Sequence, residues 1–431
     1  APIIDWAVRT ALDAGSDAPY VVVGRGGDQV RGHLSDRALF LEQTEQLGTG
    51  HAVMTARDVL QNYPGYVYVL AGDTPLLRAE TLRALHQKAV DTGADAVALT
   101  ARYEDPAGYG RIVRDDAGTF LAIVEDKDAN DEQKKIQEIN ASIYCFFAPR
   151  LLKALDKITN DNAQGEYYLT DTLAIIKDAG GLVETLCLDD PEEIMGVNDR
   201  VQLAMAAQAM RRRINESLMR KGVTIIDPAN TYIDAGVSIG QDTVVYPGNY
   251  LEGATAIGSD CVLYPGNRIV DSAIGDRVSI QSSVILESQV GEGTAIGPAA
   301  HLRPGSRIGK NVRIGNFVET KKAEIGEGTK VSHLTYVGDA HIGEHTNIGC
   351  GVVFVNYDGE KKHLTEVGSH SFVGCNVNLI APVKVADNTY VAAGSTITDE
   401  VEEGDLAIAR ARQVNKKGWV ARRLQKKGES T

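Results

Sequence analysis

The sequence predicts an α/β domain followed by a parallel β-helix, and three observations support this fold class. Short strand-like and helix-like segments alternate through residues 1–198. A helical stretch without Pro follows at residues 199–222, and a six-residue pattern then recurs within residues 223–431. These three ranges are the predicted domain, linker helix and second domain.

The six-residue pattern is the clearest signal. Each unit begins with an aliphatic residue followed by Gly or another small residue, as in IGQDTV VYPGNY LEGATA IGSDCV from Ile239 and VGEGTA IGPAAH LRPGSR IGKNVR from Val290. A period of six fits neither an amphipathic helix nor an alternating strand, but it is typical of a solenoid with one inward aliphatic side chain per face. The pattern from Val237 to Ile397 predicts about nine coils, on the order of 40 Å long at ~4.8 Å per coil. A Gly-rich β-sandwich would not keep this phase.

Residues 1–198 contain apolar, β-branched runs at Pro19–Gly24, Tyr66–Asp73 and Ala94–Ala101. Longer mixed segments such as AETLRALHQKAVDTG separate these runs. The alternation predicts a mainly parallel sheet covered by helices on both faces. Ligands bind such sheets at the carboxyl ends of strands, so residues directly after a strand are candidate site residues.

Residues 199–222 are rich in Ala, Met, Leu, Arg and Glu and lack an internal Gly, which predicts one long helix. Its Arg211–Arg213 cluster is expected to be a solvated helix face. The basic stretch from Lys416 to Lys427 could help to hold the phosphates of a ligand, but the last ten residues of the chain are expected to be a frayed, solvated terminus.

Composition limits the classes of function. The 431 residues are 43% hydrophobic and 24% charged, enough for two cores, and the net charge of −14 disfavours a nucleic-acid partner. The sequence shows no secretory signal and no apolar run long enough to span a membrane. An odd number of cysteines without a CxxC pair suits free thiols in a cytoplasmic protein. They are Cys145, Cys187, Cys261, Cys350 and Cys375.

Two motifs in the first domain are candidate binding elements. AGDTPL places Asp73 after an apolar strand, where a carboxylate can hold Mg²⁺ against phosphates, or can cap a helix that begins near Arg78. In QLGTGHA, Gly48 and Gly50 free the backbone and Thr49 offers a hydroxyl near a helix start. That loop suits a base or phosphate, and a simple turn leading into a helix is the alternative.

Further motifs complete a resemblance to a known family. GYGRIV, IVEDKDA, QEIN, NAQGEYYLTD and GVND follow in order ahead of the hexapeptide repeats. With QLGTGHA and AGDTPL, they resemble the bacterial bifunctional enzyme N-acetylglucosamine-1-phosphate uridylyltransferase / glucosamine-1-phosphate N-acetyltransferase over nearly the whole chain. The resemblance implies a Rossmann-like nucleotidyltransferase domain followed by a left-handed parallel β-helix, assembled as a cytoplasmic homotrimer.

The resemblance also implies two reactions. Acetyl would pass from acetyl-CoA to glucosamine 1-phosphate, and a uridylyl group would then pass from UTP to N-acetylglucosamine 1-phosphate with Mg²⁺. The products of the second step would be UDP-N-acetylglucosamine and pyrophosphate.

A nucleotide-sugar site is implied in the first domain. Its residues around the uracil, the diphosphate and the amino sugar are Gln43, Gly48 and Thr49; Gly72 and Asp73; and Gly110, Glu125 and Asn140. Asp73 with Asn198 would hold Mg²⁺.

The first domain departs from the family pattern in two places. Ala71 stands where many members have Tyr. The family opens with a first strand and a glycine-rich loop that grips the nucleotide triphosphate, whereas this sequence begins at APIIDWAV. We therefore expect uridylyl transfer to need a segment ahead of Ala1. A chain active only in acetyl transfer, and a non-catalytic hexapeptide scaffold or regulatory subunit, are the alternatives.

The hexapeptide pattern is disturbed between Val318 and Gly349, where charged and aromatic side chains gather. An imidazole titrates near neutrality and can take a proton from an amine, and the resemblance implies that His333 is the general base. The resemblance implies that Glu319 orients it. The implied sugar-phosphate contacts are Arg303, Lys321, Tyr336, Asn347 and Lys362.

The segment VNYDGEKKH leaves the hexapeptide register, which predicts a loop that projects from one coil. The residues implied to contact acetyl-CoA are Cys350, Asn356, Tyr357, Cys375, Ala393 and Arg410. Cys350 stands where many members have Ala, and Cys375 where many have Ser.

Overall fold

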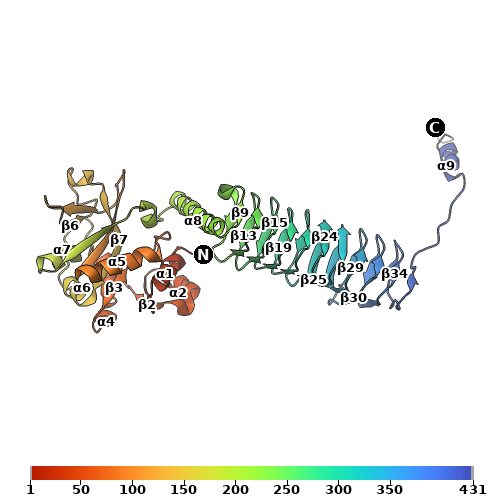
Figure 1. Cartoon of the computed structure of the whole chain (residues 1–431), viewed down its shortest axis with the longest axis horizontal. Helices are drawn as coiled ribbons and strands as arrows, with labels where there is room; N and C mark the ends of the chain where they lie inside the picture. Colours follow the sequence, from red (N-terminus) through yellow and green to blue (C-terminus); the bar gives the residue numbers. More distant parts are fainter. Residues whose placement is uncertain (1, 429–431) are drawn as a thin grey trace. The chain divides into compact units, whose positions relative to one another are not determined.

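The computed structural model describes residues 2–428, with side chains described to residue 426. The described chain divides into two compact units, one up to Met210 and one from Arg211 onward (Figure 1). The predicted limits at Ala1 and Thr431 and the side chain of Lys427 lie outside the described part. None of the described helices has the length and apolar character that a membrane span requires.

Helices and strands alternate in the first unit. The helices are α1 (Ile3–Asp13), α2 (Gly27–Leu34), α3 (Thr49–Met54), α4 (Arg57–Leu60), α5 (Ala79–Thr92), α6 (Ala148–Leu155) and α7 (Asp171–Asp178). The strands are β1 (Tyr20–Val23), β2 (Leu39–Glu42), β3 (Tyr66–Val69), β4 (Ala96–Arg102), β5 (Arg111–Arg114), β6 (Phe120–Val124), β7 (Glu138–Phe147) and β8 (Val183–Cys187).

Strand β7 is the centre of the main sheet. It pairs antiparallel with β3, β4 and β5, while β4 pairs in parallel with β8 and β6 pairs antiparallel with β5. Strands β1 and β2 form a separate parallel pair. The sheet is therefore mixed, and the prediction of a mainly parallel sheet is wrong. Apolar runs report that a strand is buried but not its direction, and β7 was not among the predicted strands.

Helices cover both faces of this sheet, as predicted. On one face Ala98 of β4 packs in a cluster with Leu151 of α6 and Leu173 of α7. On the other face Val97 of the same strand packs in a cluster with Leu85 of α5. Successive side chains of a strand point to opposite faces, so β4 contributes to two separate cores.

The second unit is the predicted left-handed parallel β-helix of hexapeptide repeats, built from stacked strands in three ladders (Figure 1). The first ladder is β9 (Thr224–Ile225), β12 (Val244–Val245), β15 (Val262–Leu263), β18 (Ser279–Ile280), β21 (Ala295–Ile296), β24 (Arg313–Asn316), β26 (Lys330–His333), β28 (Asn347–Ile348), β31 (Phe372–Val373), β34 (Tyr390–Val391) and β36 (Leu406–Ala407).

The other two ladders share two long strands. The second ladder is β10 (Tyr232–Ile233), β13 (Tyr250–Glu252), β16 (Arg268–Val270), β19 (Val284–Leu286), β22 (His301–Leu302), β25 (Glu319–Ile325), β27 (Tyr336–Ile342), β29 (Val353–Val355), β32 (Asn378–Ile380) and β35 (Thr396–Ile397). The third ladder is β11 (Ser238–Ile239), β14 (Ala256–Ile257), β17 (Ala273–Ile274), β20 (Gln289–Val290), β23 (Arg307–Ile308), then β25 and β27, then β30 (Thr365–Val367) and β33 (Val383–Val385). Strands β25 and β27 pair in both ladders, so each continues round a corner.

Strand pairing extends from Thr224 to Ala407, beyond the predicted range of Val237 to Ile397. The first and last coils carry fewer of the hexapeptide glycines, so the sequence pattern fades before the solenoid ends. Helix α9 (Trp419–Gly428) follows in the stretch that was expected to be a solvated terminus. The side chains of Trp419 and Leu424 are exposed, so the stretch is solvated but helical.

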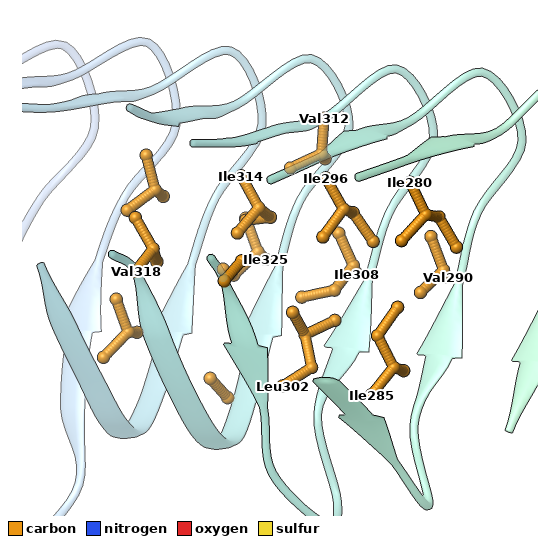
Figure 2. Packing of buried hydrophobic residues seen from close by; sticks show 14 of the residues in the cluster. Ile280, Ile285, Val290, Ile296, Leu302, Ile308, Val312, Ile314, Val318 and Ile325 are labelled. Atoms are coloured by element: carbon orange, nitrogen blue, oxygen red, sulfur yellow. The ribbon is translucent and has the colours of Figure 1, made fainter. Parts of the chain in front are cut away.

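One aliphatic side chain from each strand fills the interior of the β-helix. Figure 2 shows Ile280, Ile285 and Val290 of one coil beside Ile296 and Leu302 of the next, and each is at most 5% exposed. Full burial of such a side chain stabilises the fold by about 1.5–3 kcal/mol. Because every coil contributes its own interior residues, the core is continuous along the solenoid.

The glycine that follows each aliphatic residue is required by the close approach of the next coil. A Cβ on Gly326 would lie 2.6 Å from the carbonyl carbon of Gly343, and one on Gly275 would lie 2.8 Å from the amide nitrogen of Glu292. Neither glycine has a positive φ, whereas the corner residue His345 has a φ of 52°. The repeat glycines therefore set the coil spacing.

Helix α8 (Arg200–Arg220) joins the two units. It lacks Pro and Gly, and its Ala209 packs with Leu76 of the first unit. The prediction that Arg211–Arg213 form a solvated face is only partly right. The Arg211 guanidinium stacks 4.8 Å from the ring centre of Tyr232, and Arg213 is half-buried.

The continuous core predicts a large effect of a single cavity. Leu263 on β15 is fully buried, so Leu263→Ala should destabilise the β-helix by about 2–5 kcal/mol in denaturant titration. Leu406 on β36 of the same ladder is 62% exposed, and Leu406→Ala should change stability by less than about 0.5 kcal/mol. Equal effects of the two substitutions would contradict the described packing.

Candidate functional site

In the first unit, the QLGTGHA loop is bound to the NAQGEYYLTD segment by backbone hydrogen bonds. The Gly50 N–H donates to the carbonyl oxygen of Tyr167 at 2.8 Å, and the Tyr167 N–H donates to that of Leu47 at 2.8 Å. Gly48 has a φ of 108°, and a Cβ there would lie 2.7 Å from the Tyr167 carbonyl oxygen. The loop therefore needs glycine both for its conformation and for its approach to this segment.

The three residues predicted around the uracil lie together. The Gln43 Nε2 donates to the Gly48 carbonyl oxygen at 3.2 Å and lies 3.1 Å from the His51 Nδ1. Thr49 is the first residue of α3, and its hydroxyl accepts the Leu169 N–H at 3.1 Å. The motif is thus both a turn leading into a helix and a fixed loop.

Asp73 and Asn198, the predicted metal ligands, meet at Gly196. A Cβ on Gly196 would lie 3.4 Å from the Asp73 Oδ2 and 3.7 Å from the Asn198 Nδ2. The N-cap of α5 is Arg78, so Asp73 does not have the alternative role of capping that helix. Gly72 precedes Asp73, and a Cβ added at Gly72 would meet only the side chain of Ile4 among the described residues.

The described residues contain no group of three or more His, Cys, Asp or Glu side chains that could hold a metal. A carboxylate and an amide are hard oxygen ligands, and Mg²⁺ is commonly held by one or two such groups together with substrate phosphates. The pair formed by Asp73 and Asn198 fits that arrangement.

Glu125 stands beside Gly110 and Asn140, the other residues predicted to hold the amino sugar. A Cβ on Gly110 would lie 3.3 Å from the Glu125 Oε2 and 3.5 Å from the Asn140 Cβ. The Asn140 Nδ2 donates to the Tyr144 hydroxyl at 2.7 Å, and the Asn140 N–H donates to the Gly110 carbonyl oxygen at 2.8 Å. The predicted sugar residues therefore form one cluster.

Burial raises the pKa of the Glu125 carboxyl, and the nearby carboxylates of Asp171 and Asp128 raise it further. A hydrogen bond from the Thr170 hydroxyl to Oε1 at 3.0 Å opposes this shift. A half-buried carboxyl with one such donor can accept further hydrogen bonds from a bound hydroxyl group. Sequence reasoning assigned no role to Thr170, because it lies 45 residues from Glu125 and no local pattern joins the two.

In the second unit, three cations gather at one corner, which we call the cationic corner: Arg303, Lys321 and Lys362. The Lys362 amino group beside Lys321 lowers the pKa of Lys321, burial and Arg303 lower it further, and Asp339 opposes the shift. The Arg303 Nη1 also lies 2.9 Å from the Glu319 Oε1. Mutual repulsion of this kind favours an anion that binds between the cations.

The polar wall beside the cationic corner consists of Tyr336, Asp339 and Asn356. Asn356 is 6% exposed, and its Nδ2 donates to the Asp339 Oδ2 at 2.5 Å and to the Tyr336 hydroxyl at 3.5 Å. A Cβ on Gly338 would collide with the Tyr336 hydroxyl and the Asn356 amide, so glycine makes room for both. Sequence reasoning missed Asp339, a corner residue with a φ of 46°.

His333 lies at the end of β26, directly opposite Asn316 of β24 in the neighbouring coil. The His333 Nδ1 lies 2.6 Å from the Asn316 Oδ1. An amide oxygen only accepts hydrogen bonds, so Nδ1 donates in this contact, and in the neutral imidazole the lone pair then lies on Nε2. The partner described for His333 is thus Asn316, whereas Glu319 pairs with Arg303. Orientation of His333 by Glu319 stays a prediction.

The loop between β29 and β30 is held by its own contacts. Tyr357 and Lys362 form an isolated antiparallel bridge, and the His363 N–H donates to the Asn356 carbonyl oxygen at 2.8 Å. Asp358 accepts backbone N–H groups of the loop and lies 2.6 Å from the His363 Nε2, which lowers the pKa of its carboxyl. The projecting loop that the sequence predicts is therefore an ordered element.

The other predicted coenzyme residues follow one corner of successive coils. The Asn376 N–H donates to the carbonyl oxygen of Cys350 at 2.8 Å, and the Gly394 N–H donates to that of Cys375 at 2.8 Å. A Cβ on Gly394 would lie 3.9 Å from the Arg410 Cδ. Cys350, Cys375 and Ala393 thus occupy the same position in three successive coils. Arg410 lies close to Gly394, the residue that follows Ala393.

Asn347, a predicted sugar-phosphate contact, lies apart from the cationic corner. It belongs to β28 in the first ladder, where it pairs with Lys330 and Phe372. The contacts described for residues 2–426 do not join it to the other predicted sugar-phosphate residues.

These two arrangements define a two-unit transferase with a nucleotide-binding domain ahead of a hexapeptide-repeat β-helix. The family profile described as MobA-like NTP transferase domain matches residues 1–173, and that of the bacterial transferase hexapeptide matches residues 287–322. The chain belongs to the family of proteins named bifunctional protein GlmU. A relative of that name from Caldanaerobacter subterraneus subsp. tengcongensis is 54% identical over 425 residues, covering 99% of this chain and 93% of the relative.

Two further relatives with the same name are similarly close. The protein from Acetivibrio thermocellus is 52% identical, covering 98% of this chain and 92% of the relative. The protein from Clostridium beijerinckii is 52% identical, covering 99% of this chain and 93% of the relative. A solved structure of UDP-glucose pyrophosphorylase with UDP-glucose aligns with 43% of this chain at 17% identity, and its TM-score of 0.35 is too low to carry a conclusion.

The pKa of Glu125 predicts how a neutral replacement changes stability with pH. The pKa of Glu125 in the folded state is raised above its ordinary value of 4.5. Its contribution to the stability of the fold is therefore fully present below pH 4.5, and it is lost as the pH rises through the folded-state pKa. Glu125→Gln keeps an oxygen that accepts from Thr170 and removes the charge. It should therefore raise the melting temperature of the first unit at pH 7, and the gain should vanish at acid pH.

A surface carboxylate provides the control for this measurement. Glu132 is 82% exposed beside Lys135, and Glu132→Gln should change stability by less than about 0.5 kcal/mol at any pH. A lower melting temperature for Glu125→Gln at pH 7, or a gain independent of pH, would show that burial does not control this carboxyl.

Proposed function

We propose that this chain acetylates glucosamine 1-phosphate with acetyl-CoA and then transfers a uridylyl group from UTP to the product, giving UDP-N-acetylglucosamine and pyrophosphate. The observation that supports this most strongly is 54% identity along nearly the full length of a bifunctional relative. A chain active only in acetyl transfer and a non-catalytic scaffold are not favoured, because the similarity covers both units.

We assign the reactions to the predicted domains. Uridylyl transfer belongs to residues 1–198, acetyl transfer to residues 223–431, and residues 199–222 are the linker helix. Free thiols and substrates such as UTP and acetyl-CoA suit action in the cytoplasm.

In acetyl transfer, the cationic corner binds the phosphate of glucosamine 1-phosphate and His333 serves as general base. The amine attacks the thioester carbonyl carbon, so a C–N bond forms and the C–S bond to coenzyme A breaks. The Nε2 of His333 takes the proton that the amine loses. Asn316 supports this role, because its Oδ1 accepts a hydrogen bond from Nδ1, so that the lone pair of the neutral imidazole lies on Nε2.

The remaining acetyl-transfer residues position the two substrates. Tyr336 and Asn356 belong to the polar wall beside the phosphate site, and Tyr357 lies in the loop from Asn356 to His363. We propose that Asn347 contacts the sugar phosphate. The residues that we propose to line the acetyl-CoA site, together with Asn356 and Tyr357, are Cys350, Cys375, Ala393 and Arg410. A stacked scaffold orders these side chains before the substrates arrive, which lowers the entropy lost on binding.

In uridylyl transfer, Gln43, Gly48 and Thr49 bind the uracil, and Gly110, Glu125 and Asn140 bind the amino sugar. A phosphate oxygen of N-acetylglucosamine 1-phosphate attacks the α-phosphorus of UTP, and pyrophosphate leaves. The raised pKa of Glu125 favours hydrogen bonding with a sugar hydroxyl.

The nucleotidyl transfer is metal-dependent, and we propose Mg²⁺ as the metal. Asp73 and Asn198 would hold it, with Gly72 leaving room for the phosphates. When bound, Mg²⁺ offsets phosphate charge.

A reciprocal pair of substitutions tests this assignment. His333→Ala should lower kcat for acetyl transfer by roughly 10²–10⁴ and leave KM little changed, because a general base acts in the transition state. It should not change pyrophosphate release from UTP. Asp73→Asn should impair pyrophosphate release and leave coenzyme A release unchanged. Near-normal acetyl transfer by His333→Ala would exclude His333 as the base.

We also propose that the chain assembles as a homotrimer, with acetyl-CoA bound between neighbouring β-helices. The resemblance to the family supports this assembly, and Cys350, Cys375 and Ala393 lie at one corner of successive coils, where a neighbouring β-helix could approach them. Light scattering should give three chains per particle. A monomer with full acetyl-transfer activity would rule the assembly out.

A further inference from the structure

Cys350 and Cys375 lie at the same level of one corner in adjacent coils. Ile348 pairs with Val373, and the Gly349 N–H donates to the Val373 carbonyl oxygen at 2.8 Å. On the other side of the two cysteines, the Asn376 N–H donates to the Cys350 carbonyl oxygen at 2.8 Å. Hydrogen bonds therefore fix the register on both sides of the cysteine pair.

This register brings the two cysteines within reach of each other. Residues directly opposite in neighbouring parallel strands are separated by about 4.8 Å, the spacing of the strands. A disulfide needs Cα atoms about 4.4–6.8 Å apart. The spacing of the coils therefore meets the Cα requirement, and the two Cβ atoms need to approach only slightly to reach the separation of about 3.5–4.5 Å that a disulfide has.

Both thiols are free, and both are accessible, since Cys350 is half-buried and Cys375 is exposed. Cys145 and Cys261 are also free but fully buried, and burial raises the pKa of Cys145 to about 12. Cys187 is exposed but belongs to the first unit. Among the described cysteines, Cys350 and Cys375 are thus the pair that combines access to solvent with proximity.

The segment between them is the coil with the projecting loop. Cys350 and Cys375 are separated by 375 − 350 = 25 positions, whereas Cys375 and the next equivalent residue, Ala393, are separated by 393 − 375 = 18. The additional residues lie within the loop from Asn356 to His363, which contains the bridge between Tyr357 and Lys362. A disulfide between the cysteines would therefore link the two ends of the coil that carries the projecting loop.

We propose that Cys350 and Cys375 are a dithiol site that a low-molecular-weight disulfide oxidises reversibly, and that the resulting bond reduces acetyl transfer. The second part rests on the proposed function, in which both residues line the acetyl-CoA site. One cysteine thiolate attacks the disulfide, forms a mixed disulfide and releases one thiol. The second thiolate then attacks the protein sulfur of that mixed disulfide, so the cysteines become bonded and a second thiol leaves.

The net reaction is balanced. The protein dithiol loses two electrons and two protons, and the small disulfide is reduced to two thiols. A dithiol reductant reverses the reaction. The bond would hold the two coils at the corner and occupy both sulfur atoms beside the proposed acetyl-CoA site, so the coenzyme would bind more weakly.

Oxidised glutathione is the probe for the test. The full chain is incubated with it, remaining thiols are alkylated, and peptides are mapped by mass spectrometry without reduction. We expect a cross-linked peptide that joins Cys350 to Cys375 and a loss of two hydrogen atoms from the intact mass. Cys350→Ser and Cys375→Ser should each abolish the cross-link and leave a stable glutathione adduct on the remaining cysteine.

Cys187→Ser is the matched control, because it removes an exposed thiol outside the β-helix. It should form the same cross-link as the wild type. Recovery of Cys350 and Cys375 only as separately alkylated residues, in a chain whose Cys187 has reacted with glutathione, would overturn the proposal.

Activity measurements separate this proposal from the proposed function. Oxidation should raise the KM for acetyl-CoA and leave pyrophosphate release unchanged, and a dithiol reductant should restore the initial KM. Prior addition of acetyl-CoA should slow formation of the cross-link. If the cross-link forms but acetyl transfer is unchanged, the dithiol site is supported and its placement at the coenzyme site is overturned. A chain without acetyl transfer in its reduced form would count against the proposed function instead.

Discussion

In-register stacking of the coils is the constraint on which the functional surface of the second unit depends. Each coil buries its own aliphatic residues, and glycines such as Gly326 allow the next coil to approach closely. Side chains about one coil apart in sequence are therefore placed side by side, about 4.8 Å apart along the solenoid. Arg303 and Lys321 are neighbours for this reason, because Leu302 pairs with Thr320 in the ladder.

The same stacking accounts for the contacts of the candidate base. Asn316 and His333 stand opposite each other in β24 and β26, and the amide oxygen of Asn316 accepts a hydrogen bond from Nδ1 of the imidazole. An exposed side chain on a flexible loop would lose entropy when it became ordered for catalysis. Here the stacked coils themselves order the pair. The loop that begins at Asn356 then brings Lys362 beside Lys321 in the cationic corner.

The fold of the β-helix could be predicted from the sequence because a period of six has few physical interpretations. The direction of β7 could not, because apolar runs do not encode strand direction and its partners lie far away in the chain. The sequence motifs identified many candidate residues, and the structure brings Gln43, Gly48 and Thr49 together. Thr170 and Asp339 were missed because their partners, Glu125 and Asn356, lie far from them in the sequence and no local motif joins the two residues of either pair.

Phosphate binding at the cationic corner is the central claim for the second unit, and calorimetric titration with glucosamine 1-phosphate tests it most directly. We expect Lys321→Met to weaken binding by about tenfold or more, equivalent to about 1.4 kcal/mol or more, because a charge-assisted contact is lost. Glucosamine without phosphate should bind much more weakly to the unaltered chain. Equal affinity of the unaltered chain and Lys321→Met for glucosamine 1-phosphate would contradict the account.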